Sequence, residues 1–189
     1  MPHKATREQI VAAADQLFYQ QGYEYTSFAD IAAAVSISRG NFYYHFKSKD
    51  DILEAVIRLR LGNTQAMLEL WASQGKTAQE RVRCFIQLLI RNRAKIALYG
   101  CPVGTLCGEL AKLEHPALND ANQLFRLFRH WLRQQFESMG HRDQADALAM
   151  HLLARSQGIA TLAQAFQDQA FIEQEAEQLD IWLTQLGTH

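Results

Sequence analysis

Two side chains between residues 36 and 49 suit the reading of DNA bases. Arg39 carries a guanidinium fork that can pair with O6 and N7 of guanine, and Asn41 carries an amide that can pair with N6 and N7 of adenine. Each such pairing discriminates against a wrong base by about 1–3 kcal/mol. We therefore predict that Arg39 and Asn41 carry sequence specificity.

Other polar side chains nearby suit contacts to phosphate, which give affinity and register but carry no sequence information. Gly40 removes a side chain where a helix would lie closest to a groove, and Ser38 could reach a base or a phosphate. For the three adjacent residues Tyr43 to His45, the alternative is a surface without a partner. The further candidates for DNA contact are Ser27, Ser38, Gly40, Tyr43, Tyr44, His45, Lys47 and Lys49.

The charge that DNA binding needs is local. The chain has 19 Lys and Arg against 20 Asp and Glu, a net charge of about −1, so it has no overall positive field. Between Ser36 and Lys49, however, three residues are basic and none is acidic. Four acidic residues, Glu8, Asp15, Glu24 and Asp30, all precede this window.

Three helices are predicted to position this patch. Apolar residues at helical spacing predict a first helix over 6–21, which Gly22 ends. Thr26 or Ser27 can cap a short helix through Val35, and Ser38 can cap another that is anchored by Phe42 and Phe46. Ser48 can cap a fourth helix that begins at Lys49. Two short helices with a tight turn, braced by a longer one, form a helix-turn-helix arrangement.

The segment GYEYTSFADIAAAVSISRGNFYYHFKSKDDIL, Gly22 to Leu53, resembles the N-terminal DNA-binding domain of the TetR family of bacterial transcriptional regulators. The resemblance implies a DNA-binding head over residues 1–50 and a helical effector-binding and dimerisation domain over 51–189. In the turn between the two short helices, the family commonly has a glycine where this chain has Ser36. We therefore expect a strained or altered turn there.

The composition predicts an all-α chain. Apolar residues make up 48% and charged residues 21% of 189 residues, and only 3 are proline and 10 glycine. No apolar stretch is long enough to span a membrane and the polar start lacks a signal peptide, so we expect a cytoplasmic protein. Beyond residue 76, chain breaks predict five helices, over 77–98, 102–113, 117–138, 142–166 and 168–186.

The last two predicted helices carry apolar stripes at 4-3-4-3 spacing. Two such helices from each of two copies would form a four-helix bundle, although the same spacing could close the core of a single subunit. The resemblance favours dimerisation, because the family usually dimerises through its last two long helices. The predicted interface residues are Leu148, Leu152, Ile159, Leu162, Phe166, Ile172, Leu179, Leu183 and Leu186.

The resemblance also implies a small-molecule effector, and hence a mostly apolar pocket in the body. The aromatic stripe around Phe128 and Trp131 could instead be ordinary core. The candidates for effector binding or sensing are Trp71, Cys101, Cys107, Leu110, Phe128, Trp131 and Arg155.

Cys101 precedes Pro102, a favoured first residue of a helix, and a thiol at a helix N-terminus is made more reactive by the helix dipole. Cys101 could therefore sense electrophiles or oxidants, or it could be a small buried residue. With three cysteines and no export signal, we expect reduced thiols.

The sequence thus predicts a homodimeric repressor that a small-molecule effector releases from a palindromic operator. One alternative is a thiol-sensing repressor that acts through Cys101. The other, which is less favoured, is a helical ligand-binding protein without specific DNA affinity. The chain has no nucleophile elbow, zinc-protease motif or dinucleotide fingerprint, and its Cys and His spacing does not fit a zinc site. We therefore expect no enzymatic activity, no cofactor and no metal.

Overall fold

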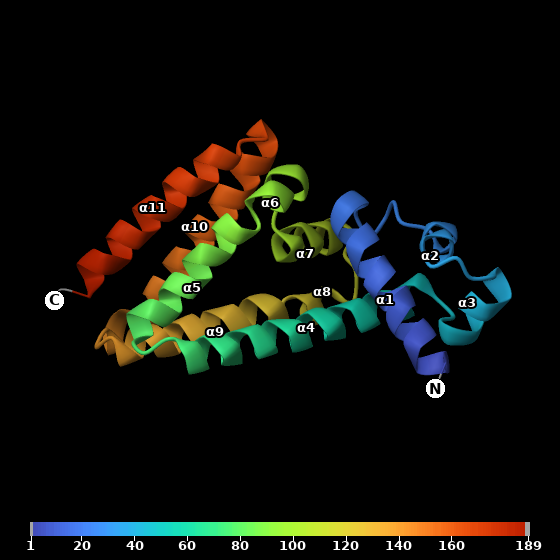
Figure 1. The fold of residues 1–189 in the computed structure, drawn as a ribbon, viewed down its shortest axis with the longest axis horizontal. Helices are drawn as coiled ribbons and strands as arrows, with labels where there is room; N and C mark the ends of the chain where they lie inside the picture. The colour runs from blue at the N-terminus through green and yellow to red at the C-terminus, as the bar shows by residue number, and fades with distance from the viewer. Residues whose placement is uncertain (1, 188–189) are drawn as a thin grey trace. The chain divides into compact units, whose positions relative to one another are not determined.

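The computed structural model describes residues 2–187, except for the side chains of residues 2–5 and 39. This part of the chain is all-α, without a β-strand, as predicted (Figure 1). Its elements are α1 (Pro2–Gln21), α2 (Phe28–Ala34), α3 (Arg39–His45), α4 (Lys49–Gln74), α5 (Ala78–Arg91), α6 (Arg93–Tyr99), α7 (Pro102–Lys112), α8 (Leu118–Ala121), α9 (Gln123–Ser138), the 3-10 helix η1 (Arg142–Gln144), α10 (Ala145–Phe166) and α11 (Gln169–Leu186).

Local capping explains the first four helices. Gly22 ends α1 with φ +92°, a left-handed conformation that glycine adopts without steric cost. Ser27 caps α2 in a capping box with Asp30, and Ser38 caps α3 by accepting the N–H of Asn41 at 3.3 Å. Ser48 accepts the N–H of Asp51 at 3.0 Å and so caps α4. The predicted caps are confirmed at all of these positions.

The turn between α2 and α3 is strained, as expected from Ser36. This residue has φ 54°, in the left-handed region where a side chain other than that of glycine is costly. Its N–H donates to the carbonyl of Ala33 at 3.1 Å, and the N–H of Ile37 donates to the carbonyl of Ala32 at 3.3 Å. These bonds close the end of α2, so the turn keeps its form without glycine.

In the rest of the chain, the structure contains the predicted breaks and two more. The expected helix over 77–98 is divided at Asn92 into α5 and α6, and the expected helix over 117–138 is divided at Asn122 into α8 and α9. The side-chain amide of Asn92 donates to the carbonyl of Leu88 at 2.9 Å. Asn92 therefore satisfies the end of α5 with its own side chain, without proline or glycine.

By its packing, the chain divides into two compact units. The first contains the chain up to Asn63 together with Thr105–Leu124, and the second contains Thr64–Gly104 together with the chain from Phe125 onward. Hence α4 and α7 each contribute to both units. This division by packing differs from the sequence boundary placed at residue 50, because Thr105–Leu124 packs with the head.

Each unit has its own apolar core. In the first unit, Ile10, Ile31, Phe42, Ile52 and Leu53 are at most 1% exposed. The core of the second unit is larger, and its fully buried members include Ile86, Leu132, Phe136, Leu152 and Leu183. Among the helices within residues 2–187, none has both the length and the apolar composition needed to cross a bilayer.

Candidate nucleic-acid interface

The N-terminal half of α3 presents small and polar groups at the surface. Gly40 and Asn41 are exposed, and a Cβ added to Gly40 would meet no atom within 4 Å. The backbone N–H of Asn41 is bound to the Ser38 cap, while the exposed side chain carries the amide suited to adenine. The side chain of Arg39 lies outside the described residues, so its base-reading role stays a prediction.

The opposite face of α3 is anchored in the core of the head. Phe42 is 1% exposed and Phe46 is 2% exposed, which confirms their prediction as core anchors. The ring of Phe28 from α2 packs edge-on against Phe42, with centroids 5.1 Å apart. Because Phe42 in the middle of α3 and Phe46 just after its end are both buried, the helix packs on this side and leaves its polar side at the surface.

The C-terminal half of α3 carries the predicted phosphate-binding side chains. Tyr43 is 47% exposed and Tyr44 is 67% exposed, so both phenol groups are accessible. Tyr43 also packs against Phe28 at 5.4 Å, and Tyr44 packs against the half-buried His45 at 5.3 Å. These contacts restrict the rings and leave them at the surface, where hydroxyl groups can meet phosphate oxygens.

Lys47 is exposed just beyond the end of α3. Its ammonium donates to the carbonyl of Tyr43 at 2.6 Å, a favourable site for a cation because helix carbonyls are unpaired there. Its backbone N–H and that of Ser48 donate to the carboxylate of Asp51, at 3.0 and 2.9 Å. These bonds, first that from Ser48, hold the pKa of Asp51 below its ordinary value.

Two predicted DNA contacts have structural partners within the head. Lys49 donates through Nζ to the carbonyls of Tyr23 and Glu24, at 3.0 and 3.2 Å. The Ser27 hydroxyl donates to a carboxylate oxygen of Asp30 at 2.7 Å and accepts the Asp30 N–H at 3.2 Å. Lys49 and Ser27 thus order the loop before α2 and the start of that helix, and their contact with DNA stays a prediction.

The structure adds two surface residues to the candidates. The guanidinium carbon of Arg7 lies 4.7 Å from the ring centroid of Phe46, so α1 brings a positive charge next to the C-terminus of α3. Tyr25, in the loop before α2, is 84% exposed. Arg7 lies 32 positions before the start of α3 in the sequence, so only the fold reveals its proximity.

In α10 and α11, most of the predicted interface side chains lie in the core of the chain itself. Leu162 and Phe166 are 46% and 75% exposed, whereas Leu148 and Leu186 are partly buried against that core. These buried side chains pack within the chain itself, whereas the outward rows of α10 and α11 are exposed. The buried ones are Leu152, Ile159, Ile172, Leu179 and Leu183.

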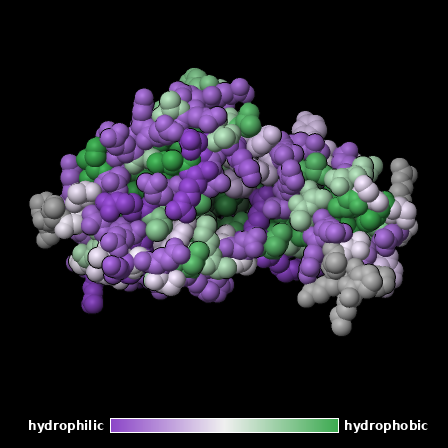
Figure 2. Space-filling model, viewed as in Figure 1, coloured by the Kyte–Doolittle hydropathy of each residue, from purple (hydrophilic) through white to green (hydrophobic). Residues whose placement is uncertain are grey.

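An outward row on α10 repeats every four residues and consists of Met150, Ala154, Gly158, Leu162 and Phe166, all exposed. The apolar stripe predicted for this helix combined residues of this exposed row, Leu162 and Phe166, with the buried Leu152 and Ile159. We call the five residues, together with the exposed Ile181 of α11, the outward face. Hydrophobic patches also interrupt the hydrophilic surface over α11 in Figure 2.

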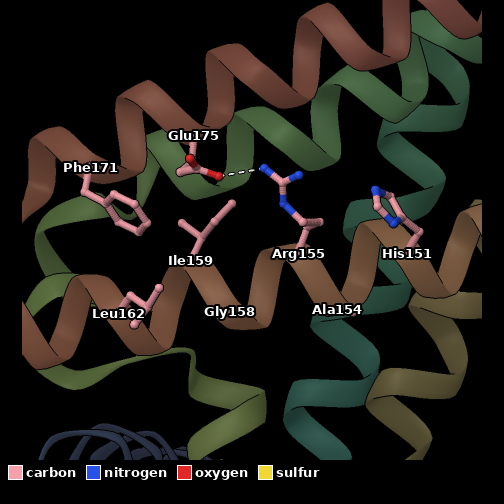
Figure 3. Close-up of a pocket in the computed structure, with 8 residues that line it drawn as sticks. All are labelled: His151, Ala154, Arg155, Gly158, Ile159, Leu162, Phe171 and Glu175. Atoms are coloured by element: carbon pink, nitrogen blue, oxygen red, sulfur yellow. Dashed lines mark hydrogen bonds and ion pairs between the residues drawn. The ribbon is translucent and has the colours of Figure 1, made fainter.

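An open pocket of about 340 Å³ lies on the outward face between α10 and α11. Figure 3 shows Arg155 and Glu175 joined across it at 2.6 Å, with Phe171, Ile159 and Leu162 on one side of that pair and His151 on the other. The walls are therefore mostly apolar around one ion pair. Arg155 is the one member of the predicted effector set that lines this pocket.

The remaining effector candidates do not form one group. Trp71 and Trp131 pack together in the second unit, with ring centroids 5.6 Å apart, and Phe128 packs against Phe85 at 5.5 Å. Cys107 and Leu110 are buried in the first unit. The predicted set thus combines residues of two separate cores.

Cys101 carries a half-buried thiol directly before α7. The side-chain amide of Gln157 from α10 donates to its sulfur at 3.4 Å. Gly104 makes room for this amide, because an added Cβ would lie 2.2 Å from Oε1 of Gln157. Within the described residues, no group of three His, Cys, Asp or Glu side chains could hold a metal ion.

The fold and the surface of α3 define a helix-turn-helix DNA-binding regulator. A sequence model described as bacterial regulatory proteins, tetR family, matches residues 10–56. The chain is 28% identical over 186 residues to an HTH-type transcriptional regulator from the lacX 3′ region of Lactococcus lactis, with 96% of this chain and 95% of that protein covered. Over residues 10–56 the chain thus has a helix-turn-helix domain of the kind found in the TetR family of bacterial transcriptional regulators.

Further similarities extend over part of the chain or over most of it. The regulator AcrR from Shigella flexneri is 41% identical over 58 residues, which cover 31% of this chain and 27% of AcrR. A TetR transcriptional regulator from Legionella pneumophila has the same fold, with a TM-score of 0.80 and 27% identity over 92% of this chain and 94% of that one. The predicted family, fold class and DNA-binding regulatory function are thereby confirmed.

Proposed function

We propose that this regulator is a homodimeric repressor that binds a palindromic operator and leaves it when a small-molecule effector binds the second unit. The observation that carries the proposal is the polar, exposed N-terminal half of α3 on an aromatic anchor. One short helix reads only a few base pairs, so two copies related by a twofold axis would read two half-sites. Such a repressor acts on chromosomal DNA, and we therefore assign it to the cytoplasm.

The outward face is the proposed dimer interface. Its row at four-residue spacing forms a ridge suited to packing against the same ridge of a second copy. Gly158 supports this assignment, because a Cβ there would meet no atom within 4 Å of the same subunit. A glycine inside a helix costs roughly 1 kcal/mol relative to alanine, and close approach of a second helix would account for it.

For the effector, we propose the aromatic part of the second core, around Trp71, Trp131 and Phe128. Aromatic walls suit a planar or apolar small molecule. The buried Gln135 adds a polar group beside Trp131, whose carbonyl it binds at 3.2 Å. Because these rings are packed against one another, binding requires them to separate, and that rearrangement is what could change the DNA-binding state.

A thiol-sensing mechanism is the second candidate, since Cys101 is partly accessible and bonded to Gln157. An electrophile on its sulfur would displace the Gln157 amide. The Cys101→Ser variant should then bind operator normally but stay bound in the presence of a mild electrophile. Release of Cys101→Ser by the same electrophile would remove Cys101 from the mechanism, with Cys84→Ser as the control.

The first experiment is selection of bound sequences from a random duplex pool, followed by titration of the selected duplex against scrambled DNA at fixed salt. We expect a palindrome, bound at least a hundredfold more tightly than scrambled DNA. Asn41→Ala should lower operator affinity by about 5- to 150-fold and relax the preference at one position of each half-site. The matched control is Asn63→Ala, an exposed asparagine on α4 outside the α3 surface.

Selection of no palindrome by the folded protein would overturn the proposed specificity. An unchanged preference in Asn41→Ala would instead remove that residue from base reading. The same selected duplex then serves for effector screening, by its release from the protein.

A further inference from the structure

The loop between α1 and α2 is bound by a carboxylate from a distant helix. The backbone N–H of Tyr23 donates to Oε2 of Glu109 at 2.9 Å, and the N–H of Glu24 donates to Oε1 at 2.9 Å. Each carboxylate oxygen thus takes one amide of the loop. Hydrogen bonds to an ionised acceptor are stronger than those between neutral groups.

The residue before these amides is adapted to that carboxylate. A Cβ on Gly22 would lie 3.0 Å from Oε1 of Glu109, closer than ordinary contact. Gly22 also has φ +92°, which other residues rarely adopt. Its lack of a side chain therefore allows both the end of α1 and the approach of Glu109.

The same two residues are held from α4. Lys49 binds the carbonyls of Tyr23 and Glu24, and its ammonium lies 4.2 Å from the ring centroid of Tyr23. The N–H groups of the loop therefore donate to an anion on α7, and its carbonyls accept from a cation on α4. Two opposite charges fix its backbone.

A second link comes from the segment that follows α7. The ring of His115 packs edge-on against Tyr23 with centroids 5.2 Å apart, and its Nε2 lies 3.5 Å from a carboxylate oxygen of Asp50. The Tyr23 hydroxyl donates to the same carboxylate. Tyr23 is 4% exposed, so it connects α7, α4 and the loop inside the core of the first unit.

The loop is also joined firmly to α2. Thr26 is 1% exposed, and its hydroxyl donates to the carbonyl of Gly22 at 2.6 Å. Its backbone N–H donates to the carbonyl of Tyr23 at 3.2 Å, and the next residue, Ser27, caps α2. A displacement of the loop is therefore passed to the start of α2 rather than absorbed by slack chain.

We propose that Glu109 is a positioning residue for DNA recognition: its carboxylate fixes the α1–α2 loop, so that α7 sets the orientation of the helix-turn-helix. The proposal rests on the DNA-binding function stated above. The first three residues of α7 belong to the second unit, whereas Glu109 and the loop that it binds both belong to the first. A change in the position of α7 within the first unit would therefore change the positions of α2 and α3. The property that depends on Glu109 is the preferred spacing between the two half-sites.

The test uses the full-length protein, its selected operator, operators with one base pair added to or removed from the spacer, and scrambled DNA. Glu109→Gln keeps the shape of the side chain but loses the charge and one acceptor. It should lower operator affinity about tenfold and reduce discrimination between spacers, while binding to scrambled DNA stays within twofold of the unmodified protein. Glu114→Gln, an exposed residue just after α7, is the control and should change neither property.

Hydrogen exchange at the amides of Tyr23 and Glu24 measures the contact directly. Glu109→Gln should speed exchange at these two amides, and Glu109→Asp, whose shorter side chain reaches less far, should give an intermediate effect on exchange and on spacer discrimination. Faster exchange with unchanged spacer discrimination would overturn the proposal. An equal loss of binding to operator and scrambled DNA in both variants would also overturn it, because that result indicates only a destabilised fold.

Discussion

The recognition helix α3 and helix α10, the second-last helix of the chain, both have one buried face, but their exposed faces differ in chemistry. The outward side of α3 carries an amide, two phenols and a glycine, whereas the outward face of α10 keeps Leu162 and Phe166 in contact with solvent. A surface that meets DNA needs groups that bond to base edges and phosphates, while a surface that meets protein buries apolar area. The exposed face of a helix therefore indicates its partner better than its buried face does.

The two faces of α10 provide the strongest test of this difference. Leu152 is fully buried, so Leu152→Ala leaves a cavity and should lower the free energy of unfolding by about 2–5 kcal/mol. Chemical denaturation, followed by circular dichroism at several protein concentrations, measures the loss. A loss below about 1 kcal/mol would contradict the assignment of Leu152 to the core.

Leu162→Asp should separate the copies while each subunit stays folded. A charge in the proposed dimer interface would be buried without a partner, so we expect monomers at micromolar concentration and at least a hundredfold weaker operator binding. Sedimentation and operator titration measure these two effects. Leu70→Asp is the matched control, because Leu70 is 51% exposed on α4 but lies outside the outward face. A dimeric Leu162→Asp protein would place the interface elsewhere.

Leu152 and Leu162 also show what could and could not be predicted from the sequence. Helix ends follow from neighbouring residues, so Gly22 and Ser38 predicted helix ends that the structure contains, and of the two candidate caps predicted for α2, Ser27 is the cap. Apolar spacing alone did not separate the buried row of α10 from the exposed row, because neighbouring rows on a helix have the same spacing and are offset by only one or two residues. The division at Asn92 depends on one side-chain amide and has no proline or glycine signal.

Contacts between distant residues account for the other omissions. Glu109 and Tyr23 are 86 positions apart, and nothing in either local sequence indicates that the carboxylate binds the loop. The cation–π contact of Arg7 with Phe46 is likewise formed only when α1 crosses the end of α3. The candidate surface of α3 was predictable because its residues are consecutive, whereas the residues that orient it come from other helices.

Lys47→Ala tests the phosphate-binding half of the α3 surface. Removal of one phosphate contact should weaken operator and scrambled DNA alike by several-fold, and should reduce the slope of log affinity against log salt by about 0.9 for each subunit. Titration at four or more salt concentrations gives the slope. Lys76→Ala, an exposed lysine before α5, removes the same charge from the body and should leave the slope unchanged. A Lys47→Ala effect limited to the selected operator would indicate base reading instead.

Ser36→Gly should increase the local stability of the helix-turn-helix, and this is the smallest of the four predicted effects. Glycine adopts the left-handed conformation of this turn without steric cost, so the variant should gain about 0.5–1 kcal/mol of local stability. Hydrogen exchange at the amides of α2 and α3 measures the gain. Ser73→Gly is the matched control, because Ser73 lies within the helix α4 and the same substitution there should reduce stability. Faster exchange in Ser36→Gly would mean that the flexibility of glycine in the unfolded chain outweighs the strain of this turn.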